Sequence, residues 1–397
     1  MKLLRRVSLK NYKSIEACAI DLQSLTFLVG PNGAGKSNFL DALRFLADSL
    51  NTSLDHALRE RGGIAEVQRR SGYGGAVSIK IEFDLRNGGH GFYAVRIARK
   101  DKVFEVEREE CRIRMAGGIL GEVHFRVENG VVKSSSAPVT PPALVDRLFL
   151  VAAAGLPEFR PVYDMLSRIS VYNINPQAIA AMQKPDAGVL LRREGANAAS
   201  VLSKVSPSAR EMLNEYLSKI IPGLSGVEPR LIGMQETLEF SQKAQRQDYN
   251  WKFLAASMSD GTLRALGILL ALFQGLGKNG EAPPVIGLEE PEAALHPAAA
   301  GVLLSALREA SKTSQIIVTS HSPDLLDDSS IPSESIYAVE NQDGITLIGP
   351  LDEGGRSVLK DRLFTPGELL RLNQLSPDHS KAAEAKKIDN QSMFELE

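Results

Sequence analysis

The sequence predicts an α/β fold built on a mixed sheet, with an antiparallel β lobe and a helical insertion. The first observation is a glycine-rich loop, Gly30–Ser37, set between an apolar run and a helical pattern. The second is the strict alternation of apolar and polar residues over 77–85, which is the period of a strand with one buried face. The third is a pair of short apolar runs, Val285–Leu288 and Ile316–Val318, of the kind that forms buried parallel strands.

Composition bounds the class of protein. The chain has 397 residues, of which 43% are hydrophobic, and a formal net charge of -2. This length predicts two or three structural units, and the near-neutral charge gives no global attraction to nucleic acid or to a membrane surface. The two cysteines, Cys18 and Cys111, allow at most one disulfide and indicate buried, reduced thiols. No signal peptide or membrane span is evident, so we expect a cytoplasmic protein.

The loop Gly30–Ser37 reads GPNGAGKS and fits the phosphate-binding pattern G-x-x-x-x-G-K-S without departure. An apolar strand, Leu25–Val29, precedes it, and a helical pattern over Asn38–Leu50 follows it. In such loops, backbone N–H groups and the helix N-terminus attract phosphate oxygens. A glycine-rich turn with a chance lysine is the alternative, but strand, loop and helix agree. The candidate nucleotide-binding residues here are Gly30, Asn32, Gly33, Gly35, Lys36, Ser37 and Asn38, with Lys36 reaching the terminal phosphates and Ser37 holding Mg²⁺.

Two adjacent carboxylates end the predicted strand Val285–Leu288. We expect Glu289 to stand on the magnesium side and Glu290, one residue on, to point the other way and act on an attacking water. The alternative is a solvated acidic strand end, which the phosphate loop upstream disfavours.

A histidine ends the second predicted parallel strand. His321 follows the run Ile316–Val318 and precedes Ser322-Pro323, so it lies at a carboxyl end, where parallel sheets bind ligands. We expect it to hydrogen-bond the γ-phosphate, although a lone histidine is more often structural. His296 has weaker support and is read as shaping its loop.

A third polar stretch, Ser257–Arg264, opens a long apolar helix. Ser259 and Gly261 at its start form a candidate second phosphate-facing surface. Taken alone, the stretch fits an ordinary serine cap equally well.

Together these residues resemble the ATP-binding cassette type of ATPase, in the branch of the RecF, SMC and OLD-family heads. The order of motifs carries the resemblance, which covers about residues 1–350. It is phosphate loop, signature Ser259–Gly261, acidic pair with Glu289-Glu290-Pro291, Leu295-His296-Pro297, and Ser320-His321-Ser322-Pro323. The opening Asn11–Ile15 is similar to that family's first-strand motif.

The sequence departs from the motifs of transporter cassettes at two positions, and at both it is similar to stand-alone ATPases rather than to transporter subunits. Glu289 stands where transporter cassettes carry Asp, and Asp260 replaces the first signature Gly. The glutamine of the Q-loop stays open between Gln68 and Gln177, because spacing does not choose between them.

The patterns along the chain, taken with the resemblance, predict four segments. Residues 1–142 are expected to form the N-terminal part of the head with the phosphate loop and β lobe, and 143–256 a helical insertion with connecting strands. Residues 257–350 then complete the head, and 351–397 form a tail that we expect to be loose after Ser376, where large apolar residues are few.

The resemblance also implies a mechanism, in which two heads sandwich ATP and Mg²⁺, and Ser259 and Gly261 act on the nucleotide of the other copy. Neither a long coiled coil nor room for a nuclease domain after Pro350 is evident. We therefore expect an ATPase that dimerises and controls a separately encoded effector, in a bacterial anti-phage or toxin-like system. The alternative is a RecF-like DNA-binding or DNA-repair ATPase. Nucleic-acid binding has weak support, because acidic residues interleave the basic ones of 96–114.

Overall fold

Two compact units make up the protein. The computed structural model describes residues 3–70, 75–86, 88–100, 103–115, 122–138, 140–243, 249–276, 282–387 and 392–395. We call the unit of Lys2–Ile169, Pro332–Leu363 and Asn373–Glu397 the P-loop unit, and that of Ser170–Ile331 and Phe364–Leu372 the carboxylate unit. Each unit joins segments far apart in the sequence. The boundaries expected at residues 142, 256 and 350 stay a prediction.

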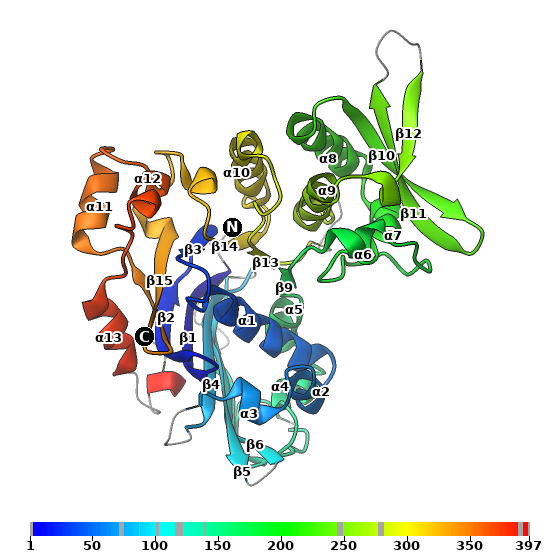
Figure 1. Ribbon diagram of the computed structural model, residues 1–397. Helices are drawn as coiled ribbons and strands as arrows, with labels where there is room; N and C mark the ends of the chain where they lie inside the picture. Colours follow the sequence, from blue (N-terminus) through cyan, green and yellow to red (C-terminus); the bar gives the residue numbers. More distant parts are fainter. Residues whose placement is uncertain are drawn as a thin grey trace. The chain divides into compact units, whose positions relative to one another are not determined.

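A mixed sheet forms the frame of the P-loop unit (Figure 1). Several of its strands are labelled in Figure 1. The strands run in the order β8-β7-β6-β5-β4-β1-β2-β16-β15-β3. Pairing is antiparallel except between β15 and β3 and between β16 and β2, where the strands are parallel. The bounds are β1 Leu4–Tyr12, β2 Ile15–Asp21, β3 Leu25–Val29, β4 Val77–Asp84, β5 His90–Lys100, β6 Val103–Arg114, β7 Glu122–Glu128, β8 Val131–Ser135, β15 Ile336–Gln342 and β16 Ile345–Pro350.

Strands β4 to β8 form the predicted antiparallel lobe. Each pairs with the next along the chain, from Val77 opposite Ile97 to Glu128 opposite Val131. The turn between β7 and β8 has Asn129 at φ 47° and Gly130 at φ 72°. Asparagine and glycine adopt this left-handed conformation most easily, which suits the Asn-Gly pair to a tight hairpin turn.

Helix α1 (Lys36–Asn51) begins at the phosphate loop and is the longest helix of the P-loop unit. Its apolar residues recur at helical spacing, and Phe39, Leu43 and Leu46 are buried. Helix α5 packs against it. The other described helices of the unit are α2 Leu54–Arg59, α3 Ile64–Val67, α4 Phe149–Ala153, α5 Arg160–Ser167, α11 Glu353–Lys360 and α13 His379–Lys386.

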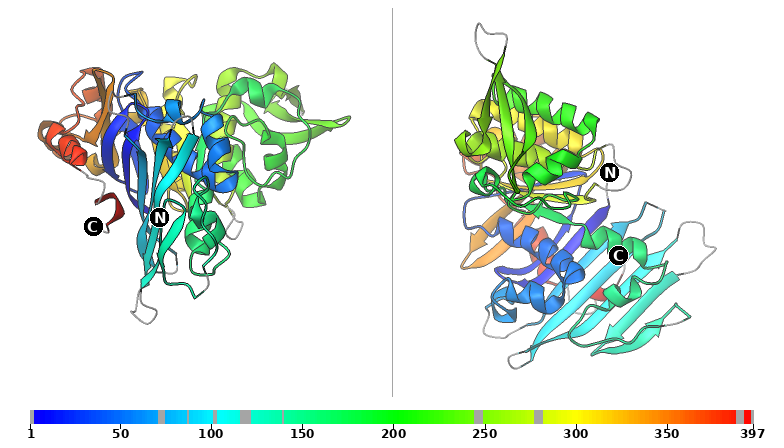
Figure 2. Two further views of the ribbon diagram at one scale, coloured as in Figure 1. Left: turned by 90° about the horizontal axis from the view of Figure 1, so that it is seen from below. Right: turned by 90° about the vertical axis from the view of Figure 1, so that its right-hand side faces the viewer.

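The loose tail expected after Ser376 is wrong for the described residues. Helix α13 is capped by the Asp378 side chain and packs on β2 and β16. Its red ribbon can be followed in the left-hand view of Figure 2. Met393 and Phe394 are buried against Phe92 and Ala94 of β5. A few apolar side chains suffice to dock a charged segment. The average composition of the segment does not reveal them. Residues 388–391 and 396–397 of this tail lie outside the described residues.

Two sets of hydrogen-bonded strands lie in the carboxylate unit. The first has the order β14-β13-β9, all parallel, and holds both predicted buried strands, which are confirmed as β13 and β14. The second is the antiparallel sheet β10-β11-β12. The bounds are β9 Ser170–Tyr172, β10 Leu224–Ile232, β11 Gln235–Lys243, β12 Asn250–Leu254, β13 Val285–Glu289 and β14 Gln315–Ser320.

Helix α9 (Asp260–Phe273) is the central helix of the carboxylate unit. It is apolar nearly all round and packs against α6, α8 and α10, which accounts for its burial on most sides. Gly267 on α9 lets α6 approach, because an added Cβ would lie 2.8 Å from Ile179 Cδ1. The remaining helices are α6 Pro176–Ala180, α7 Ala198–Lys204, α8 Pro207–Ile220, α10 Ala300–Ala310 and α12 Pro366–Arg371.

Candidate functional site

The phosphate loop follows β3 and leads into α1, as the sequence predicts. Gly35 adopts φ 99°, and an added Cβ there would lie 1.9 Å from Thr346 Oγ1. At Gly30 a Cβ would lie 2.0 Å from the carbonyl oxygen of Val339. These two positions accept glycine alone, because the loop is pressed against β15 and β16.

Lys36 folds back over the loop that precedes it. Its Nζ donates to the carbonyl oxygens of Gly30, at 2.9 Å, and Pro31, at 3.0 Å. Ser37 and Asn32 are exposed beside it, and no side chain caps the N-terminus of α1. A long helix that starts from a glycine loop, with a lysine held at its mouth, fits the phosphates of a nucleotide.

A chain of hydroxyl and amide groups supports the loop from behind. Asn38 Nδ2 donates to Ser14 Oγ at 2.6 Å, and Ser14 Oγ lies 2.6 Å from Thr346 Oγ1. Thr346 Oγ1 in turn donates to the carbonyl oxygen of Ala34 at 2.9 Å. The first-strand motif around Ser14 is therefore joined to the loop. Thr346 carried no signal in the sequence, because it belongs to a strand more than three hundred positions further on.

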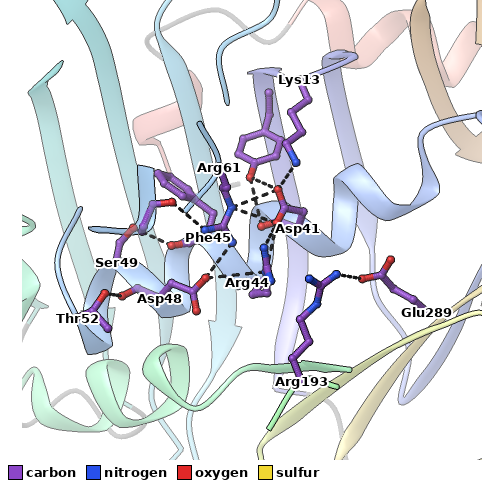
Figure 3. A network of polar contacts seen from close by, with 12 residues as sticks. Lys13, Asp41, Arg44, Phe45, Asp48, Ser49, Thr52, Arg61, Arg193 and Glu289 are labelled. Carbon is purple, nitrogen blue, oxygen red and sulfur yellow. Dashed lines mark hydrogen bonds and ion pairs between the residues drawn. The ribbon is translucent and has the colours of Figure 1, made fainter. Parts of the chain in front are cut away.

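Asp41 on α1 is the centre of a second network, drawn in Figure 3. Its carboxylate lies 2.5 Å from Lys13 Nζ, 2.9 Å from Arg44 Nη2 and 3.1 Å from Arg61 Nε. Tyr12 also donates its hydroxyl to Asp41, at 2.8 Å. Burial alone raises the pKa of Asp41, but Arg61 and Lys13 outweigh it and lower the pKa from 3.8 to about 2.

Glu289 ends β13 and is ion-paired. Its Oε1 lies 2.9 Å from Arg193 Nη2, a contact also drawn in Figure 3. Arg193 was missed by sequence reasoning, since it lies in an irregular segment with no motif. The arginine holds this carboxylate in one orientation, and carboxylate oxygens are among the ligands that Mg²⁺ takes in proteins.

Glu290 and His321 lie together at the carboxyl ends of β13 and β14. His321 Nδ1 is 3.1 Å from Glu290 Oε1, and both side chains are partly exposed. The two residues were predicted separately, from different strands, and the parallel register of the strands brings them into contact. A carboxylate beside an imidazole can accept or relay a proton from water.

Glu292 adds a buried carboxyl to this end of the sheet. Ser320 Oγ donates to its Oε1 at 2.6 Å, while its Oε2 is buried without a hydrogen-bond partner. Burial raises the pKa of Glu292, opposed by the Ser320 hydrogen bond. The sequence analysis assigned Glu292 no role.

The stretch Ser259–Gly261 begins α9 as expected. Ser259 caps the helix, its Oγ accepting from the Thr262 N–H at 3.3 Å. A Cβ on Gly261 would lie 2.6 Å from the carbonyl oxygen of Ala294, so glycine is required here by packing within the unit. Both roles are compatible with an exposed, phosphate-facing helix start.

The two glutamines left open by the sequence lie in different units. Gln177 Nε2 donates to Asp260 Oδ1 at 3.2 Å, beside the start of α9. Gln68 Nε2 donates to the carbonyl oxygen of Gly75 at 2.6 Å in the P-loop unit. The Q-loop assignment stays a prediction for either residue.

Arginines of the β lobe are engaged by neighbouring acids. Arg96 pairs with Glu107, Arg108 and Arg112 both contact Glu110, and Arg114 pairs with Glu122. The positive charge of these side chains is therefore balanced locally, as expected for a mixed face.

Both cysteines are free and buried. Among the described residues, no helix is long and apolar enough to cross a membrane.

The strand–loop–helix site, the parallel strands β13 and β14 that end beside Glu290 and His321, and the antiparallel lobe define the head of an ABC-type P-loop ATPase. The chain belongs to the family described as the RecF/RecN/SMC N terminal domain, which matches residues 3–346.

Two curated relatives share short stretches with the chain. The "Chromosome partition protein Smc" of Methanocaldococcus jannaschii is 45% identical over 47 residues, or 12% of this chain and 4% of that protein. The "DNA double-strand break repair Rad50 ATPase" of Thermoplasma acidophilum is 31% identical over 104 residues, or 25% of this chain and 10% of that protein. The chain thus spans a small fraction of the length of either relative.

Solved SMC heads share the fold. An SMC head bound to the C-winged helix domain of ScpA has a TM-score of 0.56 and 16% identity, over 89% of this chain and 99% of that one. The SMC head of Pyrococcus furiosus with an extended coiled coil, bound to the C-terminal domain of ScpA, has a TM-score of 0.55 and 14% identity. That match covers 91% of this chain and 100% of the other. These similarities confirm the predicted α/β head fold.

Proposed function

We propose that this protein binds and hydrolyses ATP and uses the cycle as a switch between separate and paired heads. The observation that carries the proposal is the phosphate loop. Gly30 and Gly35 take positions that only glycine can occupy, and Lys36 is held at the mouth of an uncapped helix start. A loop of this build gives the phosphates of ATP a set of backbone N–H donors and one cation.

Each proposed binding role is assigned to a named residue. Gly30, Asn32, Gly33, Gly35 and Asn38 line or support the phosphate loop, and Lys36 turns from the loop carbonyls toward the terminal phosphates. Ser37 and Glu289 are the candidate ligands of Mg²⁺. When bound, Mg²⁺ neutralises charge on the phosphate oxygens. Arg193 would hold Glu289 in a fixed orientation for this task.

Glu290 is the proposed base that orients water, and His321 its partner. The imidazole lies 3.1 Å from the carboxylate, close enough to fix its orientation or to exchange a proton. His321 is also placed at a strand end, where it can report on the γ-phosphate.

Pairing of two copies would complete each site. Ser259 and Gly261, at the start of α9, would face the nucleotide held by the other copy. Support comes from membership of a family whose heads act in pairs, and from a helix start that remains compatible with an anion.

Replacement of Glu290 by glutamine tests the proposal. The Glu290→Gln protein should hydrolyse ATP slower by roughly two or more orders of magnitude, because the amide cannot accept a proton, while ATP binding and pairing persist. Turnover is measured in single-turnover assays and pairing by light scattering. Glu309→Gln, on α10 and paired with Lys312, is the matched control and should leave turnover unchanged. A Glu290→Gln protein with full turnover would contradict the role of Glu290.

A separately encoded effector is the proposed output. The family resemblance supports it, as does the similarity to SMC heads that were solved with a bound protein partner. The anti-phage or toxin-like setting is a prediction from the resemblance alone, since the relatives' names refer to chromosome partition and break repair. The product of a neighbouring gene should co-purify with the Glu290→Gln protein in ATP. Its absence, together with no effect of deleting that neighbour, would contradict an effector.

Direct action on DNA is the second candidate. The names of the Smc and Rad50 relatives favour it. Pairing of the lobe arginines with acids disfavours it, since a phosphate backbone is bound by cations that remain available. Salt-sensitive duplex binding that accelerates ATP turnover would favour this candidate over the effector.

A further inference from the structure

Glu290 has an unusual backbone conformation. Its φ is 45°, in the left-handed region that residues other than glycine and asparagine rarely adopt. Such a residue keeps its conformation only when its surroundings hold it there, and strain of this kind gathers at functional sites. The contacts around Glu290 are therefore informative.

Both sides of Glu290 are tied down. Its N–H donates to the carbonyl oxygen of Thr319 on β14 at 3.0 Å. Its own carbonyl oxygen accepts from Arg264 Nη2 on α9 at 3.1 Å. With His321 beside the carboxylate, the two backbone groups and the side chain of Glu290 all have fixed partners.

Arg264 bridges two separate segments with one guanidinium group. Its Nη1 donates to the carbonyl oxygen of Ile174, in the loop after β9, at 2.9 Å, while Nη2 holds Glu290. Its Nε is buried without a hydrogen-bond partner, so the group meets both carbonyls while one of its three nitrogens goes without a hydrogen bond. The planar fork of arginine can serve two carbonyls at once, which the single ammonium group of lysine does less well.

We propose that Arg264 is a positioning residue, which clamps the strained peptide of Glu290 and couples its orientation to helix α9. The inference rests on the proposed function for Glu290. It goes beyond that function because Ser259, at the start of the same helix, would contact the nucleotide of the other copy. A shift of α9 on pairing would thereby reach Glu290 through Arg264.

Replacement of Arg264 by glutamine gives the first test. Loss of the clamp should lower kcat roughly 10-fold to 100-fold while the KM for ATP stays within about twofold, because the phosphate loop is untouched. Arg264→Lys should retain an intermediate kcat. Arg308→Gln, which removes a guanidinium group from α10 of the same unit, is the matched control and should keep full turnover. An Arg264→Gln protein with unchanged kcat, or with a loss confined to KM, would overturn the clamp.

A double substitution separates positioning from independent action. If Arg264 acts through Glu290, the protein with Arg264→Gln and Glu290→Gln together should be about as slow as Glu290→Gln alone in single-turnover assays. Multiplied losses would show that Arg264 acts by another route and would overturn the proposal.

Amide hydrogen exchange tests the clamp without ATP turnover. Peptides that span residues 289–295 should exchange at least several-fold faster in Arg264→Gln than in the wild type, and at the wild-type rate in Arg308→Gln. Unchanged exchange would refute the clamp even if Glu290 proves catalytic. Conversely, the wild type could fail to hydrolyse ATP while Arg264→Gln still exchanges faster than the wild type. That result would refute the proposed hydrolysis and support the clamp. If the Arg264→Gln protein unfolds under assay conditions, the same measurements are made on Arg264→Lys. Faster exchange of the 289–295 peptides would then support the clamp, and unchanged exchange would refute it.

Discussion

Asp41 has more charged partners than any single motif in the sequence indicates. Three cationic side chains and one phenol converge on this one carboxylate of α1. Arg61 is the most deeply buried of the cations, with a side chain only 2% exposed. It also pairs with Asp48, so the network extends along the helix that starts at the phosphate loop. Asp41 thereby fixes α1 against the first-strand turn at Lys13.

Replacement of Asp41 by asparagine should destabilise the P-loop unit. The amide keeps the shape but leaves Arg61 short of one charged partner in a buried position, which costs about 2 kcal/mol or more. The cost should appear as a lower midpoint of urea unfolding at pH 7. The wild-type contribution is complete above the ordinary pKa and is lost as the pH falls from about 4 toward about 2, because the folded pKa of Asp41 is lowered.

Asp55→Asn is the control for that experiment. Asp55 pairs with Arg59 on the exposed face of α2, and such surface pairs contribute about 0 to 1 kcal/mol. Equal effects of the two substitutions would contradict a special role for the Asp41 network.

At the scale of elements, Glu109 joins strand β6 to helix α4. The helix has no side-chain cap of its own, and Glu109 accepts instead from the N–H groups of Phe149, at 2.5 Å, and Leu150, at 2.8 Å. Tyr93 donates its hydroxyl to the same carboxyl at 2.9 Å. Burial outweighs these hydrogen bonds and raises the pKa of Glu109 from 4.5 to about 7.

The raised pKa of Glu109 predicts that stability falls as the pH rises from about 4.5 to about 7. The folded state holds the proton over this range while the unfolded state releases it, so the stabilisation is complete below pH 4.5 and lost above 7. At about 1.4 kcal/mol per pKa unit, the change is on the order of 3 kcal/mol. Urea unfolding at a series of pH values measures it. Glu109→Gln should flatten this part of the profile, and an unaltered slope would refute the assignment to Glu109.

At the scale of the whole molecule, pairing of two copies can be tested by substitutions that fold normally. Ser259→Asp keeps a good helix cap, since aspartate is favoured at a helix start, yet it sets a negative charge where the other copy's phosphates would lie. We expect ATP binding to persist and turnover to fall about 10-fold or more. Ser206→Asp, at the cap of α8, is the matched control.

Mixing two impaired proteins gives a sharper outcome. Lys36→Ala removes the phosphate-loop cation, and Ser259→Asp spoils the surface offered to a partner. In a symmetric pair that shares its sites, a mixed dimer regains one intact site, so an equal mixture should recover up to about a quarter of wild-type turnover. No recovery, in a mixture shown to form mixed dimers, would mean that each head works alone.

Much of the fold was accessible from local patterns. Alternation over Val77–Leu85 predicted β4, and the apolar runs before Glu289 and His321 predicted β13 and β14. These predictions succeed because burial of one face of an element produces a regular pattern of apolar residues in consecutive positions. The prediction of a loose C-terminal tail was wrong. Met393 and Phe394 pack on a strand hundreds of positions away, and two such residues produce no periodic pattern in the sequence.

The sequence by itself determined the phosphate loop, the residues at the strand ends and the order that assigns the chain to its family. Those features are contiguous, and the chemistry of phosphate binding requires particular residues at fixed spacing. Only the tertiary structure decided the supporting contacts of Thr346, Arg193 and Arg264. Their roles depend on which distant segments the strand register and helix packing bring within hydrogen-bond distance, and one sequence carries no periodic trace of such contacts.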